Sequence, residues 1–174
     1  LVELLDPLPL IVRTLVDYPE ALHVVEDGDS FAENATKKAC QQAVHLSGWV
    51  LGEDSGLCVD ALDGAPGIYS ARFAGPQAKD PENNGLLIEQ LTDVPTDRRH
   101  AHYVCHAVLS DPTGTIQGST TGKCHGRIRC EEVGNHGFGY DPLFEVREYH
   151  RTFGELGPKL KSSISHRSRA ISQL

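Results

Sequence analysis

Hydrophobic residues recur along this chain with the periods of both helices and strands, which indicates an α/β protein. The strongest helical pattern covers residues 30–47. Its apolar positions are Phe31, Ala35, Ala39, Ala43 and Leu46. Ser30 and Glu33 match the Ser-x-x-Glu capping box that starts such a helix, and Gly48 is placed to end it. We therefore expect one helix over this segment.

Short apolar runs predict the strands of a sheet. Residues 49–52 and 57–60 form two such runs, and the polar turn sequence 53–56 separates them. Alternating apolar residues predict a longer strand at 101–110. Residues 115–126 are its expected antiparallel partner across an Asp-Pro-Thr-Gly turn.

The rest of the chain carries shorter signals. Residues 1–6 are typical of the end of a helix, which Pro7 would stop. Another helix is expected with Asp80 as its cap and Pro81 at its first position. Three further segments complete the prediction: a strand within 10–16, a strand at 143–146 and a terminal helix at 160–174.

Composition narrows the class of protein. The 174 residues fit one domain, and 39% hydrophobic with 23% charged residues is ordinary for a soluble globular protein. No apolar run reaches the length of a membrane span. A net charge of −8 disfavours nucleic acid, whose backbone requires a basic face. The five cysteines include no Cys-x-x-Cys pair, which indicates free thiols in a reducing, cytoplasmic compartment.

Glu53 and Asp54 are adjacent carboxylates at the expected end of a strand. In α/β folds, ligands collect at the carboxyl ends of strands. Mg²⁺ prefers oxygen ligands and is usually held by one or two carboxylates together with substrate phosphates. The pair therefore suits a magnesium site, although the four residues 53–56 taken alone are more typical of a solvated turn.

The start of the helix at 30–47 carries further candidate groups. Because this helix leads into the strand before Glu53 and Asp54, its Glu33 could lie near these acids. The alternative is that Glu33 only caps the helix. Lys37 and Lys38 follow one turn later, and for both the alternative is a solvated helix surface.

A glycine-rich loop at 134–142 carries two aromatic residues and an acid. Glycine lets the backbone approach a flat ligand closely, so that Phe138 could stack on it and Asp141 could accept hydrogen bonds. The alternative is an ordinary hairpin loop with a buried aromatic side chain.

Two other groups of side chains are candidates for binding. Lys161, His166 and Arg167 place three potential anion donors within seven residues, although they could also form a basic helix surface. Cysteine and histidine residues crowd the predicted hairpin at 101–126, which raises the possibility of zinc. No pair there has the usual ligand spacing, so structural or surface roles are preferred.

Five segments of the chain occur in an order that resembles the inosine triphosphate pyrophosphatase family, the non-canonical purine nucleoside triphosphate pyrophosphatases. They are residues 30–35, 53–56, 64–72, 138–142 and 165–167. This resemblance implies one domain over residues 1–174, with a mixed twisted sheet flanked by helices and two lobes around a central cleft. It also implies Mg²⁺-dependent hydrolysis of ITP, dITP and XTP to monophosphate and pyrophosphate, by an enzyme that is usually a homodimer.

The resemblance also assigns the catalytic and metal-binding residues. Asp54 resembles the general base that would deprotonate a water for attack on the α-phosphorus. Glu33, Glu53 and Asp54 resemble the metal ligands, and many members carry Asp where Glu53 stands.

Nine residues resemble the family's substrate contacts: Ser55, Lys38, Phe138, Gly139, Tyr140, Asp141, Lys161, His166 and Arg167. Lys38 and Lys161 look like phosphate-binding lysines. Phe138 resembles the residue that stacks on the base, and His166 with Arg167 resembles the pair at the 6-position edge of the purine.

One element of the family has no counterpart in this sequence. Members begin with a strand and a Thr/Ser-Gly-Asn-x-x-Lys loop that binds the triphosphate, and nothing precedes Leu1 here. We therefore expect that an N-terminal segment is missing from the sequence. Two alternative functions follow: a non-catalytic nucleotide-binding protein that lost the phosphate loop, and a different metal-dependent phosphohydrolase on the same scaffold.

Overall fold

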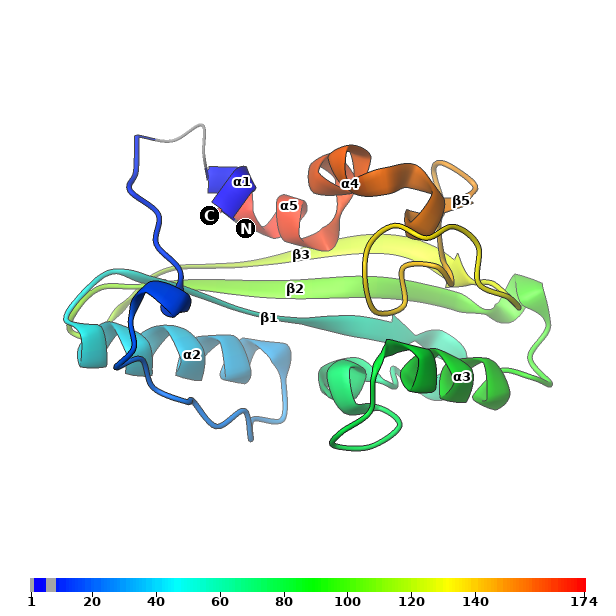
Figure 1. Cartoon of the computed structure of the whole chain (residues 1–174), viewed down its shortest axis with the longest axis horizontal. Coiled ribbons are helices and arrows are strands. Elements are labelled where there is room, and N and C mark those ends of the chain that lie inside the picture. Colours follow the sequence, from blue (N-terminus) through cyan, green and yellow to red (C-terminus); the bar gives the residue numbers. More distant parts are fainter. Residues whose placement is uncertain (1, 6–8) are drawn as a thin grey trace. The chain divides into compact units, whose positions relative to one another are not determined.

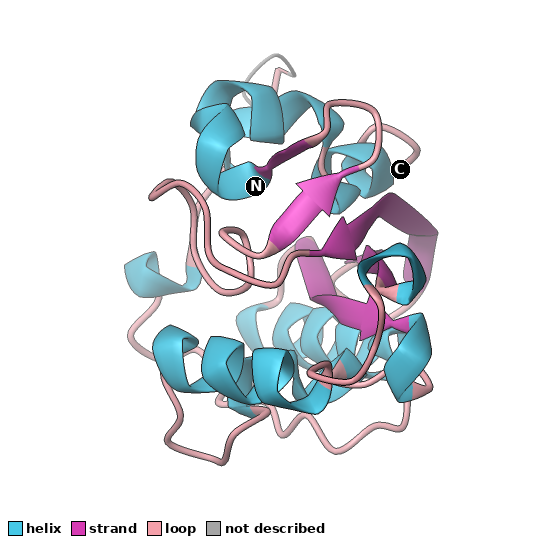
Figure 2. Ribbon diagram, turned by 90° about the vertical axis from the view of Figure 1, so that its right-hand side faces the viewer, coloured by secondary structure: helices cyan, strands magenta, loops and turns pink. Residues whose placement is uncertain are grey.

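The computed structural model describes residues 2–5 and 9–174 of the chain. The chain divides into two compact units, which are described separately below. Unit 1 comprises Leu1–Asp54, Cys105–Gly122 and Arg167–Leu174, and unit 2 comprises Ser55–Val104 and Lys123–His166. Strands and helices are both abundant (Figures 1 and 2), and the predicted α/β class is confirmed.

Five strands form one sheet in the order β1-β2-β3-β4-β5. Their bounds are β1 Val50–Val59, β2 His100–Ser110, β3 Ile116–Ile128, β4 Phe144–Val146 and β5 Arg151–Thr152. The pairs β3–β4 and β4–β5 are antiparallel, with Gly126 opposite Val146 and Glu145 opposite Thr152. The predicted turn between β2 and β3 is present, and the Asp111 N–H donates to the Thr115 carbonyl at 3.0 Å across it.

The α-helices of the described residues are α1 Val2–Leu5, α2 Phe31–Leu46, α3 Asp80–Gln90, α4 Phe153–Ile164 and α5 His166–Ile171. Short 3₁₀ turns cover η1 Leu15–Asp17, η2 Asp60–Leu62, η3 Gly67–Arg72 and η4 Thr96–Arg98. The predicted helix at 1–6 is present as α1 in its described part, and Pro7 lies outside the described residues. None of the described helices is long and apolar enough to cross a bilayer.

Helix α2 confirms the strongest prediction from the sequence. Ser30 is its N-cap, and its hydroxyl accepts a hydrogen bond from the Glu33 N–H at 3.2 Å. The helix ends at Leu46. Its C-cap is Ser47 rather than the expected Gly48, because Ser47 adopts the left-handed conformation, with φ of 50°, and the Gly48 N–H then donates to the Ala43 carbonyl. Helix α3 also forms, but its N-cap is Lys79 rather than the predicted Asp80.

The prediction of two strands separated by a turn at 53–56 is wrong. Residues 50–59 form the single strand β1, and Glu53, Asp54, Ser55 and Gly56 lie within it. Because β2 lies beside β1 in the sheet, the backbone of this polar segment is held by hydrogen bonds between strands. Pairing of strands thus overrides the local turn preference of Ser-Gly.

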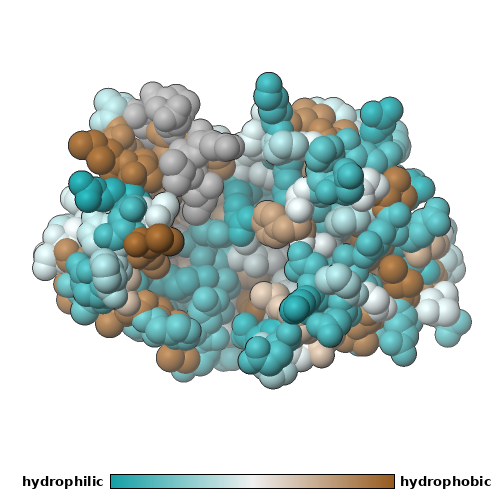
Figure 3. Space-filling model, viewed as in Figure 1, coloured by the Kyte–Doolittle hydropathy of each residue, from teal (hydrophilic) through white to brown (hydrophobic). Residues whose placement is uncertain are grey.

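The strand predicted within 10–16 is not formed. Residues 10–14 have no regular structure, and Leu15–Asp17 is the short turn η1. The side chains of Ile11 and Val16 are 90% and 91% exposed, and apolar side chains of this segment reach the surface (Figure 3). An apolar run without a partner strand has no ladder to join, so its β propensity is not realised.

The prediction of a single terminal helix at 160–174 is also wrong. The structure has two helices, α4 and α5, and Ser165 between them has extended backbone with φ −68° and ψ 163°. Helix α4 begins earlier than predicted, at Phe153, and it is kinked where Gly157 has a φ of 73° before Pro158.

The core of unit 1 has helices on both faces of its part of the sheet. Ala35 and Ala39 of α2 pack with Val108 of β2. Ala170 of α5 packs with Cys105 and Ala107. Since neighbouring residues in a strand point to opposite faces, α2 and α5 cover opposite faces of β2.

The core of unit 2 is larger. Its fully buried members include Leu87 of α3, Phe144 of β4 and Phe153 of α4. The rings of Phe144 and Phe153 stack with their centroids 5.5 Å apart. Tyr140 of the glycine-rich loop at 134–142 is 3% exposed and belongs to this core, so it anchors the loop there.

Gly52 allows α2 to approach β1 closely. A Cβ at this position would lie 2.6 Å from the Ala39 nitrogen and 2.9 Å from the Ala35 carbonyl oxygen. We therefore expect Gly52→Ala to lower the free energy of unfolding by about 1–3 kcal/mol, because a helix backbone would have to move. Gly85→Ala is the control: nothing lies within 4 Å of its Cβ, and it should raise stability slightly as a helix-interior Gly→Ala change. Urea denaturation of both variants checks this, and equal effects would contradict the close approach.

Candidate active site

Asp54 lies on β1 in unit 1 with its carboxylate against α2. The Lys38 ammonium donates to Asp54 Oδ1 at 2.9 Å, and Asn34 Nδ2 donates to Oδ2 at 3.3 Å. Asn34 and Lys38 are four residues apart on α2, so both lie on the same face of the helix. Asp54 is 8% exposed and Asn34 is 1% exposed, whereas the Lys38 side chain is 25% exposed, so the polar group is buried on one side and open to solvent at Lys38.

The environment of Asp54 changes its acidity. Burial raises the pKa of this carboxyl above the ordinary value of 3.8. The hydrogen bond and charge of Lys38 act in the opposite direction, as does Asn34, while the charge of Glu26 adds to the rise. A carboxylate with a raised pKa is a better proton acceptor than an ordinary aspartate, which suits a general base.

Glu26 also belongs to the group of polar side chains around Asp54, although it was not predicted as a site residue. Its Oε2 lies 3.3 Å from the Lys38 ammonium, so that two carboxylates surround one cationic group. No motif marks Glu26 in the sequence. Asn34 was also missed, but its spacing of four residues from Lys38 on one helix could have revealed it.

The two neighbouring lysines of α2 have different surroundings. Lys37 pairs at 2.6 Å with Asp27, whose side chain is 70% exposed. The solvated-surface alternative therefore describes Lys37. Lys38 instead reaches the buried carboxylate of Asp54.

Glu53 faces away from Asp54. Because the two residues are consecutive in a strand, their side chains point to opposite faces of the sheet. Glu53 Oε1 accepts from Arg167 Nε at 3.1 Å, and the Arg167 Nη2 lies 3.0 Å from the same oxygen. Glu53 Oε2 accepts from the buried thiol of Cys105 at 3.4 Å. Burial raises the pKa of that thiol strongly, followed in effect by the charge of Glu53, so Cys105 stays a neutral donor.

The predicted metal ligands are thus in three different settings. Glu33 Oε2 accepts from the Asp29 N–H at 2.9 Å next to the helix cap. Glu53 is engaged by Arg167, and Asp54 by Lys38. Within residues 2–5 and 9–174, no three acidic, histidine or cysteine side chains converge as a metal cluster. Asp54 and Glu26 do supply hard oxygen donors around a position that a cation, the Lys38 ammonium, already occupies.

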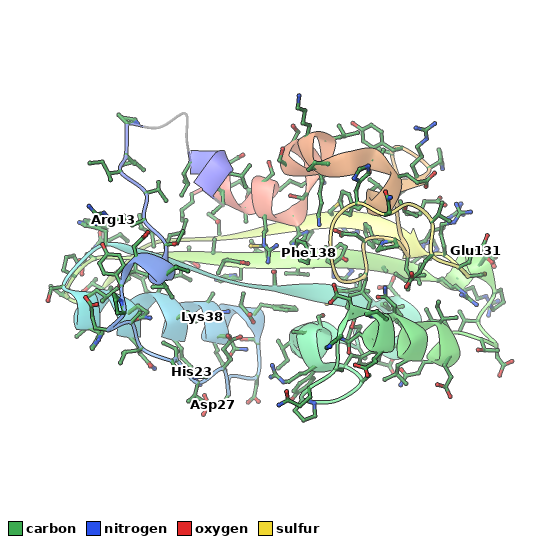
Figure 4. The ribbon with its side chains drawn as sticks, viewed as in Figure 1. Arg13, His23, Asp27, Lys38, Glu131 and Phe138 are labelled. Carbon is green, nitrogen blue, oxygen red and sulfur yellow. The ribbon has the colours of Figure 1, made fainter. Side chains whose placement is uncertain are left out.

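The glycine-rich loop of unit 2 is organised around Asp141. This carboxylate is 1% exposed and accepts from the Phe138 N–H at 2.9 Å and from the Tyr103 hydroxyl at 3.4 Å. Lys161 forms an ion pair with it. The ring of Phe138 is left 59% exposed at the surface of the loop, as a stacking residue requires (Figure 4).

Lys161 lies with this loop. Its ammonium is 4.2 Å from the centroid of the Phe138 ring and 5.4 Å from that of Phe153. His166 is also buried in unit 2, and its ring stacks on Tyr103 with centroids 4.7 Å apart and an interplanar angle of 13°. Tyr103 was not predicted as a site residue, since the alternating strand pattern marked it only as core.

Unit 2 also contains a cavity of about 530 Å³ lined by His100, His102, His125 and Arg127, among others. None of the predicted site residues lines it. His102 and His125 stack there with centroids 5.4 Å apart, and burial lowers the pKa of His102. The described residues form no metal cluster here either, so the zinc alternative gains no support.

Known proteins resemble this chain over almost its whole length. A model of the Ham1 family matches residues 1–174. This chain belongs to the Ham1 family. The resemblance to the inosine triphosphate pyrophosphatases is thereby confirmed.

Its relatives include the dITP/XTP pyrophosphatase of Rhodopirellula baltica, which is 55% identical over 98% of this chain and 84% of that protein. The dITP/XTP pyrophosphatase of Desulforamulus reducens is 47% identical over 98% of this chain and 85% of that protein. Among solved structures, a HAM1 protein from Coxiella burnetii matches with a TM-score of 0.90 and 35% identity, over 99% of this chain and 87% of that one. The Staphylococcus aureus Ham1 protein matches with a TM-score of 0.88 at the same identity and coverage.

The balance of effects at Asp54 is testable in metal-free protein. We expect NMR titration of its carboxyl carbon to give a pKa above 3.8. Lys38→Ala should raise this pKa further, because a positive charge that favours the carboxylate is removed. Lys37→Ala, which removes the neighbouring charge that pairs with Asp27, should leave it unchanged. A pKa below 3.8, or equal responses to the two lysine variants, would refute this view of the site.

Proposed function

We propose that this chain hydrolyses non-canonical purine nucleoside triphosphates, namely dITP, XTP and ITP, to the monophosphate and pyrophosphate. The observation that carries the proposal is the buried Asp54 carboxylate, held by Lys38 and Asn34. The Ham1 family also supports the proposal, because relatives of this chain, one of them 55% identical to it, are named dITP/XTP pyrophosphatases.

Asp54 would act as the general base. Its raised pKa suits it to take a proton from water, and that water would then attack the α-phosphorus with pyrophosphate leaving. Lys38 would stabilise the negative charge that develops on the phosphate oxygens. It contacts Asp54 directly, so the same ammonium would also keep the carboxylate correctly oriented.

We propose Mg²⁺ as the cofactor, with Asp54 and Glu26 as residues that hold it. These two carboxylates already surround an ammonium at 2.9 and 3.3 Å, so their oxygen donors fit a hard cation. When bound, Mg²⁺ would neutralise phosphate charge and make a bound water more acidic. Glu33 and Glu53 remain ligands that only the family resemblance predicts.

The loop of unit 2 would bind the purine. Phe138 would stack on the base. Lys161, whose ammonium lies 4.2 Å from the centroid of that ring, would bind a phosphate, as the family resemblance implies. As the family resemblance implies, His166 and Arg167 would donate hydrogen bonds that favour a 6-oxo purine. A 6-amino group would face these donors unpaired, and each mispaired buried polar group costs about 1–3 kcal/mol. Gly139, Tyr140 and Asp141 would shape this loop, and Ser55 would contact the substrate.

We further propose that residues 1–174 act as a single pyrophosphatase domain, that the protein is a cytoplasmic homodimer, and that it binds neither nucleic acid nor membranes. The net charge of −8 supports the exclusion of nucleic acid. The family resemblance supports the dimer.

The direct test is release of pyrophosphate from dITP, XTP and ITP, compared with the 6-amino nucleotides dATP and ATP, in the presence of Mg²⁺. We expect a preference for the first three of at least about thirtyfold, because two mispaired donors cost at least about 2 kcal/mol. Asp54→Asn should abolish release, whereas Asp27→Asn, an exposed acid of the same unit, should retain it.

Three outcomes would count against the proposal. Binding of these nucleotides without release by the wild type would favour a nucleotide-binding protein. Equal hydrolysis of dATP or ATP would favour another phosphohydrolase. Full activity of Asp54→Asn would show that this residue is not the base.

The ligand assignment makes a separate prediction. Glu26→Gln should raise the Mg²⁺ concentration for half-maximal activity at least about tenfold, the loss that even an outer-shell partner can cause. Glu53→Gln should leave the Mg²⁺ requirement within about twofold and raise KM instead, because Glu53 contacts Arg167. Mg²⁺ titrations of both variants decide this, and the reverse pattern would restore Glu53 as the ligand.

A further inference from the structure

Two side chains of helix α3 form hydrogen bonds with the glycine-rich loop at 134–142, and both bind the backbone of one residue, Gly139. The Asp80 carboxylate accepts a hydrogen bond from the Gly139 N–H at 2.6 Å. Asn84 Nδ2 donates to the Gly139 carbonyl oxygen at 3.2 Å. Asp80 and Asn84 are four residues apart on the helix, so their side chains lie on one face, one turn above the other.

These two bonds hold the peptide groups on either side of the Gly139 Cα. The peptide before it is held at both ends, since its N–H reaches Asp80 and its carbonyl, that of Phe138, accepts from the Asp141 N–H at 3.3 Å. The peptide after it is held through its carbonyl by Asn84. Gly139 has a φ of 60°, a left-handed conformation that glycine adopts without strain.

Both side chains are themselves held in place. Asn84 is 4% exposed, and its Nδ2 also donates to Glu132 Oε1 at 2.7 Å, which fixes the amide with its donor toward the loop. Asp80 is the first residue of α3, where a carboxylate interacts favourably with the helix N-terminus. Neither residue belongs to the predicted site, and Asp80 was expected only to cap its helix.

The neighbours of Gly139 show why this attachment matters. Phe138, whose exposed ring is the stacking residue, directly precedes it, and the buried Asp141 lies two residues later. Tyr140 is anchored separately, because its hydroxyl donates to the Ser70 carbonyl at 2.8 Å. The bonds from Asp80 and Asn84 therefore fix the backbone between the stacking ring and the fixed part of the loop.

We propose that Asp80 and Asn84 are positioning residues for purine binding: through the two peptide groups of Gly139 they set the orientation in which Phe138 meets the base. This inference rests on the proposed function. It adds a determinant of substrate affinity that does not touch the substrate. Since the base is bound alike before and during the reaction, loss of these bonds raises KM and leaves kcat nearly unchanged.

The experiment compares Asp80→Ala, Asp80→Asn and Glu89→Ala in steady-state kinetics with XTP or dITP. Asp80→Ala should raise KM about fivefold to tenfold, which is within the range expected for one hydrogen bond of typical net strength, with kcat within about twofold. Asp80→Asn keeps an acceptor oxygen and should restore KM to within about threefold of the wild type. Glu89→Ala removes an exposed acid of the same helix that has no contact with the loop, and it should have no effect.

A second variant acts on the other peptide group. Asn84→Asp places an acceptor opposite the Gly139 carbonyl and the Glu132 carboxylate, and it should raise KM at least as much as Asp80→Ala. A variant that merely folds poorly would lower the active fraction, and so the apparent kcat, at unchanged KM. That result for Asp80→Ala, or an unchanged KM, would overturn the proposal.

Amide hydrogen exchange at Gly139 separates this inference from the proposed function. Its N–H should be protected in the wild type and in Asp80→Asn, and should exchange about tenfold faster in Asp80→Ala, whether or not the protein is active. Equal exchange in Asp80→Ala and the wild type would refute the attachment itself. A wild type that exchanges as expected but hydrolyses no XTP or dITP would refute the proposed function, and with it the role in substrate binding.

Discussion

The alternation of side chains along β1 is the constraint on which the candidate chemistry of unit 1 depends. Glu53 and Asp54 are neighbours in an unbroken strand, so one carboxylate points to each face of the sheet. Asp54 thereby meets Lys38 and Asn34 of α2, whereas Glu53 meets Arg167 and the thiol of Cys105. Had these residues formed a turn, two adjacent acids could have shared one ion. In the strand, Asp54 instead pairs with Lys38 and Glu53 pairs with Arg167.

Electrostatics then determines what Asp54 can do. Burying a carboxylate destabilises the folded state unless the carboxylate is paired with a charge and hydrogen-bonded. Lys38 supplies the charge and one hydrogen bond, and Asn34 supplies another. Burial still dominates, so the pKa remains raised. Glu26 on the far side of the Lys38 ammonium makes this a site where one cation sits between two acids.

Much of this could be predicted from the sequence, and the failures have physical causes. The helix at α2, the β2–β3 hairpin and the exposed, loop-borne Phe138 follow from local periodicity and glycine content. The prediction of a turn at 53–56 was wrong because pairing between strands outweighed the preference of Ser-Gly for turns. Glu26 was missed because its contact with Lys38 bridges a loop and a helix, which no spacing in the sequence encodes.

The central claim is that Asp54 directs water to the α-phosphorus of a 6-oxo purine nucleotide. It is tested most directly by hydrolysis of XTP in ¹⁸O-labelled water, with mass analysis of both products. The account predicts one labelled oxygen in the monophosphate and none in the pyrophosphate with the wild type, and no turnover with Asp54→Asn. Label in the pyrophosphate, or in inorganic phosphate released from the terminal position, would contradict it.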